Sequence, residues 1–80
     1  DHPRLHAEVG DHDLARARAE RATRIAPFDA DTRELAARVA LVAGDTARAQ
    51  RHIEALVFLE PDREIHRRRL EAVQRLAAGG

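Results

Sequence analysis

The side chains that most often carry out chemistry in proteins are scarce in this chain. Serine, cysteine, tyrosine and lysine are absent, and the hydroxyl groups come only from Thr23, Thr32 and Thr46. No nucleophile of the common types is therefore available for activation by a histidine. The glycines are single turn residues and one terminal pair, so no glycine-rich phosphate loop is present. A self-contained enzyme is not expected.

Histidine and aspartate gather near the start of the sequence. His2 and His6 are one helical turn apart, and Asp11, His12 and Asp13 follow. Imidazoles at this spacing can face one metal ion, but these groups alone do not fix a coordination geometry. We therefore expect surface histidines, with neither a metal nor another cofactor. His52 and His66 have no partner that the sequence reveals.

The charged residues also exclude several kinds of partner. The 14 basic residues balance the 14 acidic ones, so no overall field favours nucleic acid or an anionic membrane. The densest run, Arg67 to Arg69, points in three directions about 100° apart on a helix. We expect these arginines to be solvated and to pair with Glu64 and Glu71.

Composition places further limits on the chain. No apolar run is long enough to cross a membrane, and no signal peptide is visible. A start without methionine suggests a piece of a longer protein. Arginine without lysine, together with abundant alanine, is typical of a high-GC bacterial genome. The absence of cysteine fits both the cytosol and the periplasm, so it leaves the compartment open.

The elements that position these residues follow from an internal repeat. Gly10-Asp11 recurs as Gly44-Asp45, and Pro27 recurs as Pro61, so the sequence has a period of about 34 residues. Glycine and proline divide the chain into five predicted helices, at about 3–9, 12–25, 29–43, 46–59 and 63–77. Their short connections predict antiparallel neighbours.

Caps and buried stripes complete the prediction of the helices. Asp31 with Glu34 has the spacing of a capping box, and Asp45 and Asp62 precede the next two helices. Gly44 permits a left-handed turn. The third helix is expected to bury Leu35, Val39, Val42 and Ala43. Phe28 is expected to pack between repeats and Phe58 to contact the following helix.

These residues resemble the tetratricopeptide repeat. Gly10, Asp11, Ala15, Ala22 and Pro27 fit its pattern in one unit, and Gly44, Asp45, Ala49, Leu56 and Pro61 fit it in the next. The resemblance implies an all-α, right-handed superhelical stack of antiparallel helix pairs with about five helices. It divides the single domain 1–80 into the end of one repeat (1–27), a full repeat (28–61) and a further helix A or capping helix (62–78).

The resemblance also implies a binding groove lined by the first helix, helix A, of each repeat. Its expected partner-binding residues are Glu34, Arg38, Leu41, Arg68 and Arg75, with Asp31, Ile65 and Ala72 on the same faces. Arg38, Arg68 and Arg75 together suit a carboxylate or an acidic peptide, because guanidinium pairs bidentately with such groups. The alternative is a solvated face in which Asp31 and Glu34 neutralise these arginines.

The resulting expectation is a protein-interaction or assembly module that binds a protein or peptide. Two alternatives stay open. One is a non-catalytic accessory domain of a larger bacterial enzyme or regulator. The other is a self-association element that forms a homodimer, because repeats with open ends expose apolar faces. Leu70 or Leu76 would then lie in the contact.

Overall fold

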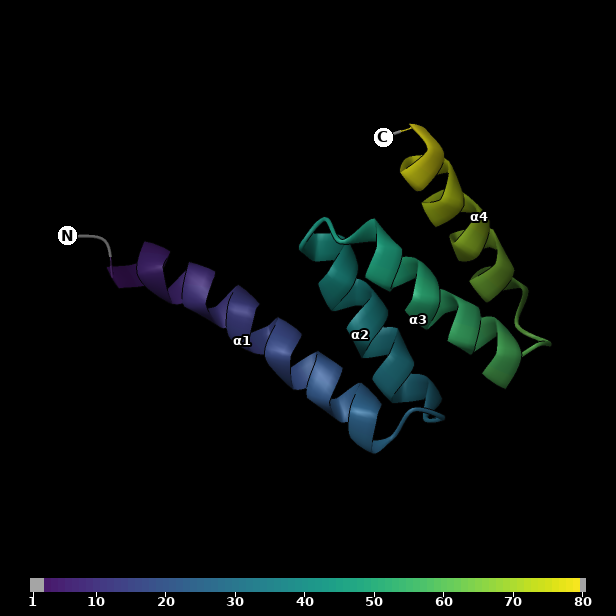
Figure 1. The fold of residues 1–80 in the computed structure, drawn as a ribbon, viewed down its shortest axis with the longest axis horizontal. Helices are drawn as coiled ribbons and strands as arrows, with labels where there is room; N and C mark the ends of the chain where they lie inside the picture. Colours follow the sequence, from purple (N-terminus) through teal and green to yellow (C-terminus); the bar gives the residue numbers. More distant parts are fainter. Residues whose placement is uncertain (1–2, 80) are drawn as a thin grey trace.

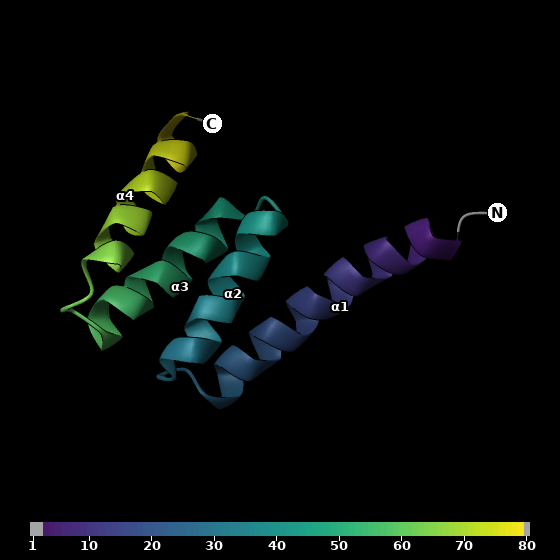
Figure 2. The same ribbon diagram turned by 180° about the vertical axis from the view of Figure 1, so that it is seen from behind.

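The chain folds as a single layer of helices. The computed structural model describes the backbone of residues 3–79 and the side chains of residues 12–79. Within that range it contains four helices and no strands: α1 (Pro3–Ile25), α2 (Ala30–Val42), α3 (Thr46–Leu59) and α4 (Glu64–Gly79). Each helix packs on the next along the chain, and successive helices run in roughly opposite directions (Figures 1 and 2). The all-α prediction is confirmed.

The first two predicted helices form one continuous helix. We expected a turn at Gly10, but α1 runs through it from Pro3 to Ile25. The described residues therefore contain four helices where the sequence predicts five. A glycine inside a helix costs only about 1 kcal/mol relative to alanine, so it weakens a helix without ending it. The chain gains stability from reversing at a glycine only where the next helix packs back on the previous one. The N-terminal part of α1 extends away from the other helices, so a reversal at Gly10 would not gain such packing (Figure 1).

The turn at Gly44 does form. Gly44 has φ 77°, a left-handed conformation that glycine adopts without strain. The amide of Asp45 donates to the carbonyl of Ala40, which closes the end of α2. Asp45 then caps α3, where its carboxylate accepts from the amide of Arg48 at 3.1 Å. Both predictions for this turn are confirmed.

The other two predicted caps lie at different residues. Asp29, rather than Asp31, caps α2: its carboxylate accepts from the amide of Thr32 at 2.9 Å and from the Thr32 hydroxyl at 2.7 Å. These bonds lower the pKa of Asp29. Helix α4 begins at Glu64, so Arg63, rather than Asp62, directly precedes it. In both connections a turn after the proline fixes where the helix begins.

The core consists mostly of small residues. Ala37 and Ala40 of α2, Ala49 and Ile53 of α3 and Val73 of α4 form one buried cluster, with Leu70 packed against it. The predicted inward face of α2 is wrong, because Leu35, Val42 and Ala43 are exposed and Val39 is only half-buried. Ile53 and Leu56 already fill the space opposite α2, so only alanines fit there at close range.

Neither phenylalanine joins the core. Phe28 is 76% exposed and Phe58 is 77% exposed, so the expected packing of Phe28 between repeats and of Phe58 against the next helix is wrong. Phe28 lies in the connection between α1 and α2, directly after Pro27. Phe58 lies in the last turn of α3, on a side that α4 does not cover.

Candidate functional site

A groove lies between α2 and α4, with the end of α3 as its floor. It has a volume of about 360 Å³. Its side chains come from α2 (Asp31, Glu34, Arg38), from α4 (Ile65, His66, Arg69) and from α3 with the connection that follows it (Leu56, Glu60, Arg63). We call this feature the α2/α4 groove. It combines an apolar floor with charged walls of both signs.

An ion pair crosses the α2/α4 groove. Arg69 Nη1 of α4 lies 2.6 Å from Glu34 Oε1 of α2, and both side chains are largely shielded from solvent. Arg38 is a second, more distant partner, with its Nε 3.4 Å from Glu34 Oε2. The hydrogen bond from Arg69 is the largest cause that lowers the pKa of Glu34, and burial opposes it. Glu34 is therefore held as a carboxylate that ties the two walls together.

His66 closes the bottom of the groove and is only 3% exposed. Its Nε2 lies 2.7 Å from Glu60 Oε1. Among the described residues its buried Nδ1 has no hydrogen-bond partner. Since a carboxylate accepts, Nε2 carries the proton in this contact, which leaves Nδ1 of a neutral ring as an acceptor. Glu60 is thus the partner of His66 that the sequence did not reveal.

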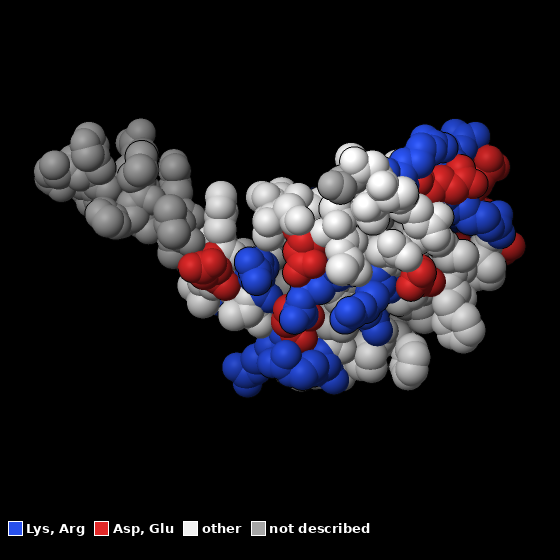
Figure 3. Space-filling model, turned by 45° about the horizontal axis from the view of Figure 1, so that its top comes forward, with Lys and Arg blue, Asp and Glu red and all other residues white. Residues whose placement is uncertain are grey.

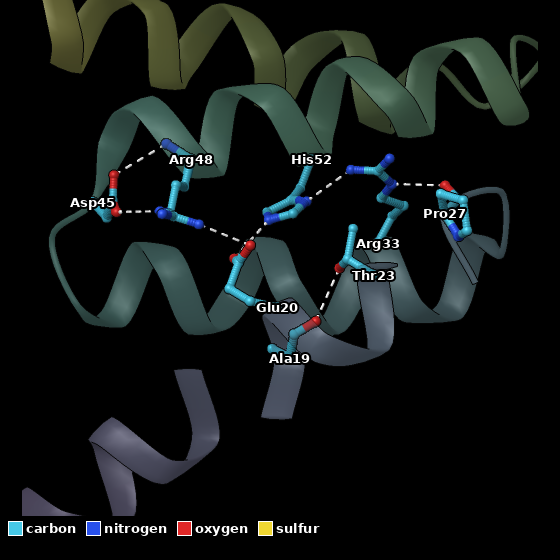
Figure 4. A network of polar contacts seen from close by, with 8 residues as sticks. All are labelled: Ala19, Glu20, Thr23, Pro27, Arg33, Asp45, Arg48 and His52. Atoms are coloured by element: carbon cyan, nitrogen blue, oxygen red, sulfur yellow. Dashed lines mark hydrogen bonds and ion pairs between the residues drawn. The ribbon is translucent and has the colours of Figure 1, made fainter. Parts of the chain in front are cut away.

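A second polar network joins the first three helices (Figure 4). His52 of α3 is 4% exposed and lies between Glu20 of α1 and Arg33 of α2. Arg33 Nη1 and His52 Nδ1 are 3.1 Å apart, and His52 Nε2 is 3.1 Å from Glu20 Oε2. A guanidinium only donates, so Nδ1 accepts and the proton lies on Nε2. The sequence does not reveal this partnership, because Glu20 and His52 are far apart along the chain.

Arg48 extends this network along α3. Its Nη1 lies 2.8 Å from Glu20 Oε1, and its Nε lies 3.3 Å from Asp45 Oδ2 (Figure 4). Glu20 thus accepts from two α3 side chains, Arg48 and His52. Long side chains thus connect α1 to α3, although the backbones of the two helices are not in contact.

One polar contact recurs at the period of the sequence. Arg33 Nε donates to the carbonyl of Pro27 at 2.8 Å, and Arg67 donates from Nη2 to the carbonyl of Pro61. Arg67 and Pro61 are the repeat counterparts of Arg33 and Pro27. The two connections are therefore tied in the same way, which gives the sequence repeat a physical basis.

The structure divides the predicted partner-binding residues. Glu34 and Arg38 line the α2/α4 groove, together with Asp31 and Ile65. Leu41, Arg68 and Arg75 lie outside its lining: Arg68 pairs with Glu64 at 3.1 Å, and Arg75 lies 4.0 Å from Glu71. Arg38, Arg68 and Arg75 therefore do not converge. Arg69, which the sequence does not distinguish within its arginine run, is the α4 arginine that enters the groove.

The surface shows no large area of one sign on the face drawn in Figure 3. Acidic and basic side chains lie next to each other over this face (Figure 3). Of the part of the chain that the structure describes, no three or more histidine, aspartate or glutamate side chains are arranged to hold a metal ion. The side chains of His2, His6 and Asp11 lie outside that part. No described helix is both long and apolar enough to cross a membrane.

Comparison with known proteins adds no further constraint. No family model matches the sequence, and neither a curated protein nor a solved structure shows a significant match to it. The resemblance to the tetratricopeptide repeat therefore rests on the repeated residues and on the helix order.

Proposed function

We propose that the chain is a protein-interaction module that holds a segment of a partner protein in the α2/α4 groove. The observation that carries this proposal is that side chains of two helices one repeat apart, α2 and α4, line one groove. Asp31 of α2 and its repeat counterpart Ile65 of α4 both lie in the lining. In this proposal the layer is a segment of a right-handed superhelical stack of the tetratricopeptide kind, with α2 and α4 as its helices A.

The groove chemistry defines the segment that fits. Its volume of about 360 Å³ lies within the usual range for binding pockets, about 300–1,000 Å³. Ile65, which is 49% exposed, offers an apolar surface for one side chain of the partner. Glu34 already neutralises Arg69, while Asp31 and Arg63 at the rim are exposed and form no ion pair within the described residues. A segment with an apolar residue flanked by one basic and one acidic side chain satisfies all of these groups.

A peptide selection tests this function. A random-peptide display library is selected on the immobilised chain, and the enriched peptides are titrated against Asp31→Arg and Arg63→Glu. Both changes lie at exposed rim positions, so the fold tolerates them, and each removes one of the two charge contacts. We expect each to weaken binding about tenfold.

Arg51→Glu is the matched control for this test. Arg51 is an exposed α3 arginine outside the groove lining. An equal loss of binding in Arg51→Glu would show only long-range attraction and would contradict the groove assignment. Enriched peptides without an apolar residue would contradict the role given to Ile65.

A further inference from the structure

A second depression lies between α1 and α2 and is separate from the groove just described. It has a volume of about 320 Å³. Ala15 of α1 and Leu35, Val39 and Val42 of α2 line it, with His12 and Arg38 at its rim. We call it the apolar hollow. Val42 is 74% exposed although it is aliphatic, so nothing within the described chain covers this surface.

The internal repeat shows what shape would cover the apolar hollow. The repeat counterparts of Ala15 and Val39 are Ala49 and Val73, which lie between α3 and α4. There the centre of the corresponding surface is closed: Ala49 is fully buried and Val73 is 3% exposed, in one cluster with Ala37 and Ala40 of α2, while Leu76, the counterpart of Val42, stays 59% exposed. Helix α2 therefore covers the surface between α3 and α4. The apolar hollow is the equivalent surface between α1 and α2, and it would be filled by a helix that packs on α1 as α2 packs on α3.

We propose that the apolar hollow binds α4 of a second copy of this chain, so that copies associate head to tail. Helix α4 is the repeat counterpart of α2, with Arg67 and Val73 in the places of Arg33 and Val39. It is also the last helix of the layer, with no neighbour on its outer side (Figures 1 and 2). Docking α4 beside α1 of the next copy repeats the arrangement of α2 beside α3.

The two surfaces complement each other in volume. Inside the chain, the small side chains of α2 (Ala36, Ala37, Ala40) meet the large side chains of α3 (Ile53, Leu56). Between copies the sizes are exchanged. Helix α4 presents the larger, exposed side chains Glu71 and Gln74 at the places of Ala37 and Ala40, and α1 presents the half-buried Ala22 where α3 has Leu56. Size exchange of this kind preserves the volume of a helix contact.

Charge complements the contact as well. Glu20 and His52, which are 3.1 Å apart between α1 and α3, have Glu54 and Arg18 as their repeat counterparts. In the docked pair Glu54 of one copy therefore faces Arg18 of the next copy, where an ion pair replaces the glutamate–histidine bond. Arg67, the counterpart of Arg33, lies beside the same Arg18, so Glu54 stands between two arginines. Glu54 and Arg18 are both exposed in the single chain.

The geometry of this contact determines the kind of assembly. Two different surfaces meet, so each copy retains one free hollow and one free α4 after pairing. Such a heterologous contact does not close on itself unless its rotation completes a ring. Mass is therefore expected to rise with concentration beyond the dimer.

Two single substitutions test the proposal by sedimentation velocity and light scattering of the whole chain. Ala15→Arg places a long charged side chain in the hollow at a position that is exposed in the single chain. We expect it to abolish association without loss of helical content. Ala17→Arg is the matched control, since Arg51, the counterpart of Ala17, stays exposed even in the covered unit. Association that persists in Ala15→Arg, or that is lost equally in Ala17→Arg, would overturn the proposal.

A mixing experiment separates head-to-tail docking from other contacts. Glu71→Arg places a long cation on the docking side of α4, because its counterpart Ala37 is fully buried against Ala49 and Ile53 of α3 inside the chain. We expect Glu71→Arg and Ala15→Arg each to be monomeric alone and to form a one-to-one dimer when mixed, because one supplies α4 and the other the hollow. A Glu71→Arg chain that dimerises alone would show a symmetric contact and would refute the proposal. A wild-type chain that stays monomeric at millimolar concentration would also refute it.

A variant that removes volume from α4 completes the test. Glu71→Ala with Gln74→Ala gives α4 the alanines of α2, so alanine would face alanine between copies and the volume that these side chains fill would be lost. We expect about tenfold weaker self-association than in the wild type. Unchanged association in this variant would contradict the assignment of α4 as the occupant.

Discussion

Buried polar side chains connect the helices of this layer through hydrogen bonds that the sequence does not reveal. His52 is the clearest case, because its two ring nitrogens bond to residues of two other helices. Arg33 serves both this network and the connection after Pro27. Such residues are visible in the sequence only as isolated polar positions, since their partners lie in different helices.

We expect His52→Ala to destabilise the fold by about 2–3 kcal/mol, because it leaves a cavity and removes two hydrogen bonds of a buried ring. Thermal unfolding followed by circular dichroism measures the change. His12→Ala is the control, since His12 is exposed, and its effect should stay within about 0.5 kcal/mol. Equal midpoints for the two variants would show that the network contributes nothing to stability.

Glu34 makes the stability of the fold depend on pH in the acidic range. Its pKa is lowered in the folded state from an ordinary value near 4.5, mainly by Arg69. The resulting stability is complete above that value and is lost as the pH falls through the lower folded pKa. The stability advantage of the wild type over Glu34→Gln should therefore shrink below about pH 4.5.

Nuclear magnetic resonance titration supplies an independent check of this dependence. In Arg69→Gln the pKa of Glu34 should rise toward its ordinary value, because the strongest hydrogen bond to the carboxylate is lost. An unchanged pKa in this variant would mean that Arg69 does not hold Glu34 in solution.

At the scale of the helices, the two described glycines show when a glycine ends a helix. Gly44 and Gly79 both have open space where a Cβ would lie, but only Gly44 has a positive φ. Alanine at Gly44 is therefore strained by its backbone alone, whereas alanine at Gly79 continues a helix. Gly10 within α1 shows that the residue type by itself does not decide the outcome.

We expect Gly44→Ala to destabilise the chain by about 1–2 kcal/mol, the cost of a left-handed alanine. Gly79→Ala should leave stability unchanged or raise it slightly, because alanine is the better helix former. Chemical denaturation of both variants measures the difference. A Gly44→Ala chain as stable as Gly79→Ala would contradict the left-handed turn.

The whole molecule is a thin layer rather than a globule. Its extents are 49 × 32 × 16 Å, and its largest fully buried side chains among the described residues are Ile53 and Leu56. A small core of this kind leaves little surplus stability. The apolar hollow leaves aliphatic side chains exposed to solvent. A helix that covers it therefore increases the buried apolar area beyond what the single chain buries.

The sequence by itself determined the helical class, the boundary at Pro27, the reversal at Gly44 and the cap at Asp45. These features depend on neighbouring residues, and local backbone preferences are enough to specify them. Glu34 and Arg38, which the resemblance assigns to a binding face, line the α2/α4 groove.

Only the tertiary structure decided which side chains are buried and which charges meet. The alanine face of α2 is inside because α3 supplies Ile53 and Leu56 opposite it, although the larger Leu35 and Val42 follow the same helical period. Arg69 rather than Arg68 reaches Glu34 because the rotation of α4 about its axis is set by Val73 and Leu70 in the core. Burial and long-range pairing depend on what the facing helix presents, and that information is spread over residues distant in the sequence.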